Sequence, residues 1–109
     1  MDPLSFFKCL ADDTRLKTIL LIHKHKELCV CDLTDLLELS QPKVSRHLAE
    51  IRKCNILQAE RRGKWVYYSI APSLLDWAKA VLEQTLIANT EYLSKPLEKA
   101  SFLKIHKCC

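Results

Sequence analysis

The segment ELCVCDLT, residues 27–34, places two cysteines one residue apart, at Cys29 and Cys31. Thiolates are soft ligands, and they favour soft ions. Within a helix, where each residue turns by about 100°, the two side chains would point to nearly opposite sides. They can share one ion if Cys29 precedes the helix and Cys31 lies in its first turn, where the helix dipole favours thiolates. The pair therefore predicts a thiolate site at the start of a helix.

Composition narrows the class of protein. The chain has 109 residues and a hydrophobic fraction of 49%, which fit one small domain that gains stability by dimerising. Its formal net charge of +4 suggests a polyanionic partner. Six cysteines would suit a secreted disulfide framework, but the N-terminal MDPLSFFKCL lacks the basic start of a secretion signal. The longest apolar run, residues 19–22, is far shorter than the roughly 18 residues of a membrane span. We expect a cytoplasmic protein with reduced thiols and no membrane partner.

Helical spacing of apolar residues predicts short helices over residues 4–10, 14–25, 31–39 and 40–53. The last of these has the clearest start, because Ser40 is a good N-cap and Pro42 suits the first turn. On this helix the apolar residues recur at intervals of four and three. The opposite face carries long or hydrogen-bonding polar side chains suited to an external partner: Gln41, Lys43, Ser45, Arg46 and His47.

After Asn55 the pattern changes to alternation, and ILQAERRGKWVYYSIA predicts two strands joined by RRGK. Gly63 is the only glycine in the chain, and a hairpin turn is where a residue that tolerates positive φ is needed. The turn also carries three bases, Arg61, Arg62 and Lys64. This segment is therefore predicted to be a basic β-hairpin.

The last predicted helix runs from Pro72 through SLLDWAKAVLEQTLIANTEYL. Its apolar stripe is wider than a small monomer needs, so part of it is expected to meet a second subunit. Residues 1–93 are thus predicted to form one domain, which includes the dimerisation surface and the polar helix and basic hairpin suited to an external partner. Residues 94–109, with Pro96 and several lysines, are predicted to form a flexible tail that ends in two cysteines.

These elements together predict a mainly α fold with a small β-hairpin, namely a winged helix-turn-helix with about five helices and a two-stranded wing. A helix with this polar face fits the DNA major groove, where Arg and Gln pair with base edges and Lys and Ser bind phosphates. Residues 40–53 hold four bases and one acid, so positive charge gathers where the helix would meet DNA. Double-stranded DNA is the predicted partner.

Four segments resemble, in order, the ArsR family of bacterial metal-responsive repressors: LADDTRLKTILLI, ELCVCDL, SQPKVSRHLAEIRKCNIL and ERRGKWVYYSI. The resemblance extends to about residue 93. It implies a homodimer whose first and last helices form the interface and whose third and fourth helices bind operator DNA. It also implies that DNA binding needs no cofactor. The expected inducer that releases the operator is trivalent arsenic or antimony, as arsenite, methylated arsenite or antimonite.

The family's arsenic site resembles Cys-Val-Cys-Asp-Leu-Cys, and here Thr34 stands where the third cysteine would be. A hydroxyl is a poor substitute for a thiolate, which leaves three explanations. A distant thiol completes the site, with Cys108 and Cys109 as donors on a tail at high effective concentration. Alternatively, the ligand needs only two sulfurs, as a methylated trivalent arsenical does. In the third explanation, the ion is cadmium, lead or zinc, which takes four ligands; two of these come from Cys9, Cys108, Cys109 or His106.

Two other functions compete with metalloid sensing. A thiol oxidoreductase or arsenate reductase would favour Cys-x-x-Cys or a phosphate-binding loop, and the sequence has neither, so we predict no enzyme. A repressor of the same fold could instead respond to oxidation, with a disulfide forming at Cys29 and Cys31 or in the tail. Cys9 and Cys54 are predicted to be packing residues rather than ligands.

Overall fold

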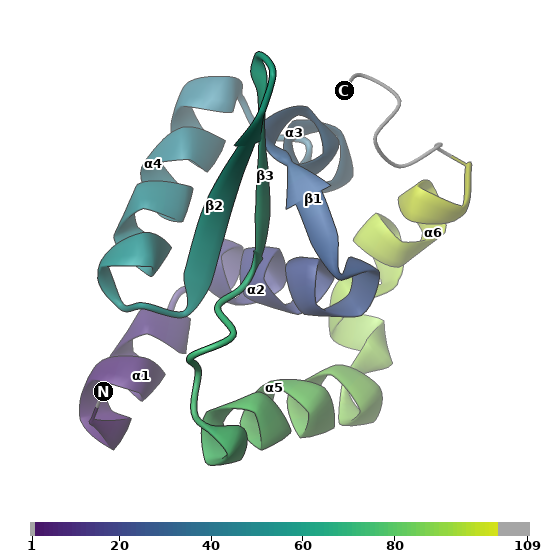
Figure 1. Cartoon of the computed structure of the whole chain (residues 1–109). Helices are drawn as coiled ribbons and strands as arrows, with labels where there is room; N and C mark the ends of the chain where they lie inside the picture. Colours follow the sequence, from purple (N-terminus) through teal and green to yellow (C-terminus); the bar gives the residue numbers. More distant parts are fainter. Residues whose placement is uncertain (1, 103–109) are drawn as a thin grey trace.

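The computed structural model describes residues 2–102, and their side chains as far as residue 98. Helices α3 and α4 form a helix-turn-helix and strands β2 and β3 form the wing (Figure 1), which confirms the predicted mainly α winged fold. The elements are α1 (Pro3–Leu10), α2 (Asp13–His25), β1 (Glu27–Cys29), α3 (Val30–Leu37), α4 (Gln41–Lys53), β2 (Leu57–Arg62), β3 (Trp65–Ile70), α5 (Asp76–Ala88), the short 3-10 helix η1 (Thr90–Leu93) and α6 (Ser94–Phe102).

The sheet has three antiparallel strands in the order β1-β3-β2, one more than the two-stranded wing predicted from the sequence. The additional strand β1 pairs with β3, so that Glu27 lies opposite Ser69 and Cys29 lies opposite Tyr67. Three residues are too few to show alternation, which is why the periodicity of the sequence did not reveal β1. As a consequence, the cysteine segment belongs to the same sheet as the wing.

Helix α4 begins where the sequence predicted. Ser40 is the N-cap, Pro42 lies in the first turn, and Val44, Leu48 and Ile51 are buried. The β2–β3 turn contains Gly63 at φ 62°, the left-handed conformation that glycine adopts without a steric penalty. The start of α4 and the tip of the wing lie at the same end of the molecule, next to α3 (Figure 1).

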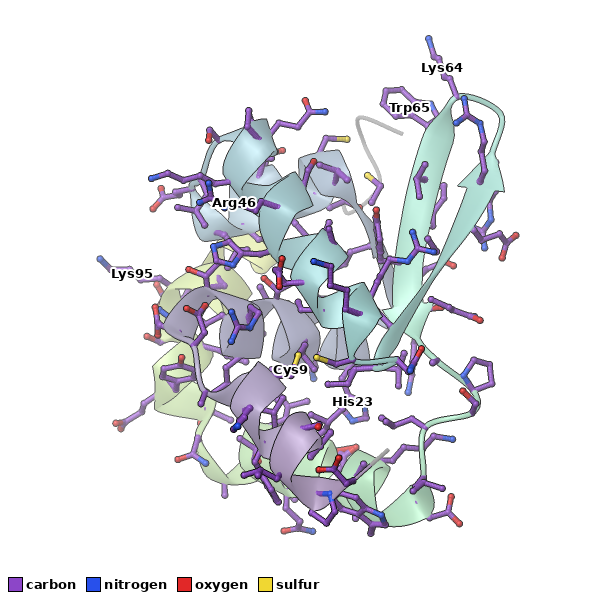
Figure 2. The ribbon with its side chains drawn as sticks, turned by 90° about the vertical axis from the view of Figure 1, so that its left-hand side faces the viewer. Cys9, His23, Arg46, Lys64, Trp65 and Lys95 are labelled. Carbon is purple, nitrogen blue, oxygen red and sulfur yellow. The ribbon has the colours of Figure 1, made fainter. Side chains whose placement is uncertain are left out.

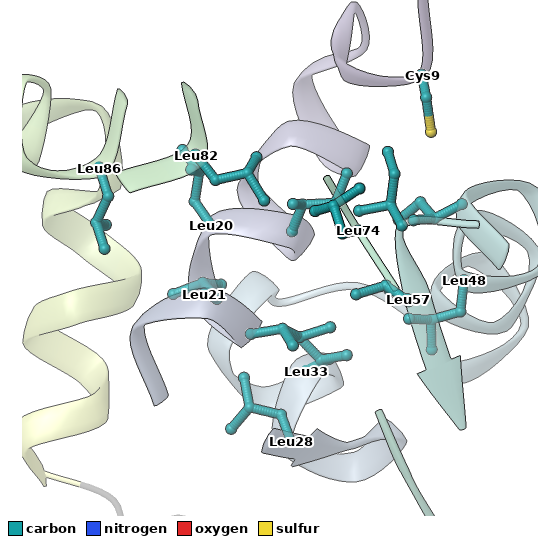
Figure 3. Close-up of a cluster of buried hydrophobic side chains, with 14 of the residues drawn as sticks. Cys9, Leu20, Leu21, Leu28, Leu33, Leu48, Leu57, Leu74, Leu82 and Leu86 are labelled. Carbon is teal, nitrogen blue, oxygen red and sulfur yellow. The ribbon is translucent and has the colours of Figure 1, made fainter. Parts of the chain in front are cut away.

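One hydrophobic core holds these elements in place. Helix α2 runs behind the sheet (Figure 1), and its residues 19–22 are fully buried. Figure 3 shows leucines from four helices and two strands gathered in this cluster: Leu20, Leu21, Leu28, Leu33, Leu48, Leu57 and Leu82. Within residues 2–102, no helix combines the length and the apolar character needed to cross a membrane.

The C-terminal region contains a further helix within residues 94–109, the segment that was predicted to be a flexible tail. Helix α5 starts at Asp76 and ends at Ala88, and residues 94–102 form α6. Leu93 is fully buried and Leu97 packs against the core, while α6 contacts α3. The predicted terminal cysteines, Cys108 and Cys109, lie outside the described residues.

Replacing a fully buried α4 residue should destabilise the domain. We expect Leu48→Ala to lower the free energy of unfolding by about 2–5 kcal/mol, because it removes apolar contacts and leaves a cavity. The matched control Lys43→Ala, on the exposed face of α4, should change it by less than about 0.5 kcal/mol. Urea unfolding measures both values, and a similar small change in the two variants would contradict this packing.

Candidate sensor site and nucleic-acid interface

Cys29 and Cys31 lie where strand β1 passes into helix α3. Cys29 is the last residue of β1 and the N-cap of α3, with extended backbone angles, and Cys31 lies in the first helical turn. Their Sγ atoms are 3.2 Å apart. Sulfur ligands bound at about 2.3 Å to one metal lie less than about 4 Å from each other. The two sulfurs therefore have the separation needed to bind a single ion, in the arrangement that the sequence predicted.

The carboxylate of Asp32 fixes the start of this helix. Its Oδ2 accepts a hydrogen bond of 3.1 Å from the backbone N–H of Cys29, and Asp32 is 5% exposed. This contact satisfies an N–H group at the helix N-terminus, where a negative charge is also favoured by the helix dipole. Because the contact is made to the backbone of Cys29, it positions one of the two sulfur-bearing residues.

Thr34, one turn after Cys31, directs its side chain to the backbone. Its Oγ1 donates a hydrogen bond of 2.8 Å to the carbonyl oxygen of Cys31, which is a common arrangement for threonine inside a helix. Among the described residues, no cluster of three or more His, Cys, Asp and Glu side chains is placed to hold a metal ion. In this part of the chain, Cys29 and Cys31 therefore form a candidate site that offers two sulfurs.

Cys9, one of the ligands considered for a divalent metal, belongs to the core instead. It is 4% exposed, and burial, together with the neighbouring thiol of Cys54, raises its pKa to about 12. Figure 2 shows Cys9 near the middle of the molecule, well separated from Trp65, a residue that lies beside the cysteine pair. Cys9 cannot reach a ligand held by Cys29 and Cys31, and its thiol stays protonated at neutral pH. His106, Cys108 and Cys109 lie outside the described residues.

A pocket of about 200 Å³ connects the cysteine pair to the DNA-binding elements. Its walls come from three places in the chain: residues 29–31 at the start of α3, Gln41 at the start of α4, and residues 64–66 at the tip of the wing. The sequence pattern does not reveal this contact, because Trp65 and Val66 reach the cysteines only through the pairing of β1 with β3. The pocket brings the cysteine pair, the start of α4 and the wing together.

The predicted DNA-binding face of α4 is exposed, with one exception. Gln41, Lys43, Ser45 and Arg46 are open to solvent, and Figure 2 shows Arg46 pointing away from the body of the protein. His47 is half-buried, with its Nδ1 3.9 Å from Oδ2 of Asp12, the N-cap of α2. The structure therefore turns His47 toward the protein and leaves the other four side chains available to a partner.

The three bases of the wing differ in their surroundings. Lys64 extends from the tip (Figure 2), and Arg61 is exposed, with one hydrogen bond of 3.1 Å from its Nε to the carbonyl oxygen of Gly63. Arg62 instead makes two hydrogen bonds of 2.8 Å to the carboxylate of Glu27. It also bonds to Glu60 at 3.1 Å and lies over the ring of Tyr67 at 4.5 Å.

The paired Arg62 has a structural role that its position in the turn did not reveal. Its contacts with Glu27 and then Glu60 raise the pKa of its guanidinium above the ordinary value. A bidentate arginine–carboxylate pair is geometrically specific, and here it ties β2 to β1 across the intervening strand β3. Arg61 and Lys64 are therefore the wing bases best placed to contact a phosphate backbone.

An exposed polar helix beside a basic wing defines a winged helix-turn-helix DNA-binding protein. Residues 12–59 match the family model described as "Bacterial regulatory protein, arsR family". The chain is 53% identical over 94 residues to the arsenic resistance transcriptional regulator ArsR1 of Pseudomonas putida, a match that covers 86% of this chain and 73% of that protein. The chain belongs to the ArsR family of transcriptional regulators and not to a class of enzymes.

The names of other similar proteins refer to different elements. A homolog of the cadmium resistance transcriptional regulatory protein CadC from Staphylococcus aureus is 34% identical, over 86% of this chain and 75% of its own length. The crystal structure of the antimony-specific transcriptional repressor AntR superposes with a TM-score of 0.67 at 31% identity, covering 81% of this chain and 77% of AntR. The chain is thus similar to transcriptional regulators that are named for different elements.

The different surroundings of the wing bases can be tested by salt dependence. We expect Arg61→Ala and Lys64→Ala each to weaken binding to all duplex sequences and to lower the salt slope of the affinity by about one. Arg62→Ala should leave that slope close to the wild-type value, because its guanidinium is held by Glu27 and Glu60. Fluorescence anisotropy of a labelled duplex at several salt concentrations measures the slopes. A loss in Arg62→Ala equal to that in Arg61→Ala would contradict the assignment.

Proposed function

We propose that this protein is a cytoplasmic, homodimeric repressor that binds operator DNA and releases it when trivalent arsenic bonds to Cys29 and Cys31. The observation that carries the proposal is the 3.2 Å separation of the two sulfurs at the junction of the wing sheet with the helix-turn-helix. The arsenic resistance regulator of P. putida and the antimony-specific repressor AntR support the choice of a trivalent metalloid.

DNA would bind at the end of the molecule that carries the start of α4 and the wing tip. Gln41 and Arg46 are suited to base edges, while Lys43, Ser45 and the wing base Lys64 are suited to phosphates. In a dimer, two such helices enter successive major grooves, about 34 Å apart, of a pseudo-palindromic operator. His47 and Arg62 contribute through the protein rather than through DNA, because both already face acidic side chains.

The dimer interface would form on α1 and α5, which expose large apolar side chains. Leu4 is 63% exposed and Ile87 is 57% exposed. The rings of Phe7 and Trp77, from α1 and α5, lie 6.3 Å apart and are also open to solvent. An apolar surface shared by two neighbouring helices is the kind of patch that a second subunit covers. This supports the dimer that operator binding requires.

Release of DNA would follow from the position of Cys29. Arsenic bonded to both sulfurs constrains the N-cap and the first turn of α3, and the same residue pairs with Tyr67 in the wing strand β3. A shift at this junction changes the angle between α3 and α4 and the position of the wing. A coupling free energy of about 1–3 kcal/mol between ligand and DNA is sufficient for a regulatory switch.

For inorganic arsenite, the third bond would come from Cys108 or Cys109. A thiol on a connected segment acts at a high effective concentration, either within one chain or between the subunits of a dimer. Cadmium is a second candidate inducer, favoured by the similarity to the CadC homolog. It requires about four ligands, so two more would have to come from residues beyond the described part of the chain.

Replacing either thiol of the pair should separate sensing from DNA binding. We expect Cys29→Ser and Cys31→Ser to bind the operator with wild-type affinity and to lose release by arsenite, because each retains only one sulfur. Cys54→Ser, at the C-terminal end of α4, is the matched thiol control and should still respond. Anisotropy of operator DNA titrated with arsenite measures release. Loss of DNA binding in the pair variants, or release by hydrogen peroxide alone in the wild type, would contradict arsenic sensing at this site.

Shortening the chain tests the origin of the third sulfur. A protein ending at residue 107 should need about tenfold more arsenite for release, since one arsenic–sulfur bond is lost. Its response to methylated trivalent arsenite should stay unchanged, because carbon already occupies the third valence of that ligand. Release titrations with both ligands decide the point, and an unchanged arsenite response would remove Cys108 and Cys109 from the site.

A further inference from the structure

The pocket beside the cysteine pair is larger than inorganic arsenic requires. Its volume is about 200 Å³, whereas a single water occupies about 30 Å³ and an apolar cavity of about 150 Å³ can hold a benzene molecule. Arsenic held by two sulfurs would leave only a hydroxyl to occupy this space. The pocket therefore has room for a ligand that carries a substituent the size of an aromatic ring.

The lining of the pocket suits an apolar substituent. Cys29 is 1% exposed, and Val30, Cys31, Trp65 and Val66 are half-buried around it. A tryptophan ring offers a broad face to a flat apolar group, and aromatic pairs gain about 0.5–1.5 kcal/mol beyond the burial of their area. The two polar lining residues are Gln41 and Lys64, which belong to the proposed DNA interface. A ligand held here would contact both parts of that interface, the start of α4 and the wing.

We propose that this site takes trivalent arsenicals bearing an organic group, with arsenic on the two cysteine sulfurs and the organic group in the pocket against Trp65. This rests on the proposed function, because it uses the same two sulfurs, and it defines the class of inducer. The described residues supply two sulfurs at this place, while the hydroxyl of Thr34 is bonded to the carbonyl oxygen of Cys31. An arsenical with one carbon–arsenic bond has two valences left, which matches that supply.

The binding reaction balances without an oxidant. In an organic arsonous acid, R–As(OH)₂, two arsenic–oxygen bonds break and two arsenic–sulfur bonds form. The proton of each thiol leaves with one hydroxide, so the products are the protein-bound R–As dithiolate and two molecules of water. Arsenic stays trivalent and the carbon–arsenic bond stays intact. A competing dithiol reverses the binding by exchange at arsenic, in which its two sulfurs replace those of the protein and the two cysteine thiols are regenerated.

Trp65 supplies a direct reporter of this geometry. The chain has two tryptophans, so the full-length Trp77→Phe protein retains Trp65 as its single indole fluorophore. Phenylarsonous acid, methylarsonous acid and arsenite are titrated into this variant to follow binding by Trp65 fluorescence. Release of operator DNA is followed separately in the wild-type protein, because Trp77 belongs to the proposed dimer interface. We expect phenylarsonous acid to change Trp65 emission at one equivalent per subunit, and Cys29→Ser to abolish the change.

Variants of Trp65 test whether its ring contacts the organic group. Trp65→Ala in the otherwise wild-type chain should lower the affinity for phenylarsonous acid by about tenfold, because an aromatic contact and the burial of its apolar area are lost. Its affinity for arsenite should stay unchanged, since arsenite has no group in the pocket. Trp65→Phe, the matched conservative variant, should restore most of the phenylarsonous acid affinity. Isothermal titration calorimetry measures these affinities without relying on the indole.

The outcomes separate this inference from the proposed function. Equal losses for arsenite and phenylarsonous acid in Trp65→Ala, or no loss for either, would overturn the organic-group pocket while leaving arsenite sensing intact. The proposed function itself would be overturned if none of the three arsenicals binds, or if their binding does not depend on Cys29. A tenfold selective loss in Trp65→Ala with recovery in Trp65→Phe would support the inference.

Discussion

The backbone pairing of β1 with β3 is the contact on which the sensor site depends. It places Cys29 opposite Tyr67 in the sheet, while the same residue is the N-cap of α3. A residue with both roles cannot move without disturbing either the strand ladder or the first turn of the helix. The two sulfurs, the helix-turn-helix and the wing are therefore connected through one short segment of backbone, with no need for a longer chain of side-chain contacts.

Charged side chains reinforce this connection on both sides of Cys29. On the side of the helix, the carboxylate of Asp32 accepts a hydrogen bond from the backbone N–H of Cys29. On the side of the sheet, Glu27 holds the guanidinium of Arg62 from strand β2 in a bidentate pair. Exposed ion pairs contribute little to stability, so we interpret the Glu27–Arg62 pair as a constraint on wing position. Ligand binding at the cysteines would act on a sheet whose edge strands are already tied together.

The sequence predicted the parts of the structure that depend on local patterns. Helix α4 was recognisable because Ser40, Pro42 and the spacing of Val44, Leu48 and Ile51 carry the signals for its start and its buried face. The hairpin was recognisable from alternation around Gly63. The placement of the two cysteines, one before α3 and one in its first turn, followed from the turn angle of a helix.

The remaining features depend on contacts between distant residues. Strand β1 is only three residues long, and it becomes a strand by pairing with β3. The same pairing brings Trp65 to the cysteine site. Nothing in RRGK distinguishes Arg62 from Arg61, because the acid that pairs with Arg62 lies 35 residues earlier. Helix α6 was missed because its few apolar residues, such as Leu97, are recognisable only when they pack on the core.

Arsenic X-ray absorption spectroscopy tests the central claim most directly, because it counts the atoms bonded to arsenic. The informative sample is the full-length protein with Cys108→Ser and Cys109→Ser, loaded with one equivalent of arsenite per subunit. Binding at Cys29 and Cys31 predicts two sulfur neighbours and one oxygen neighbour. A spectrum with oxygen neighbours alone, or one that keeps two sulfurs after Cys29→Ser and Cys31→Ser are added, would contradict the account.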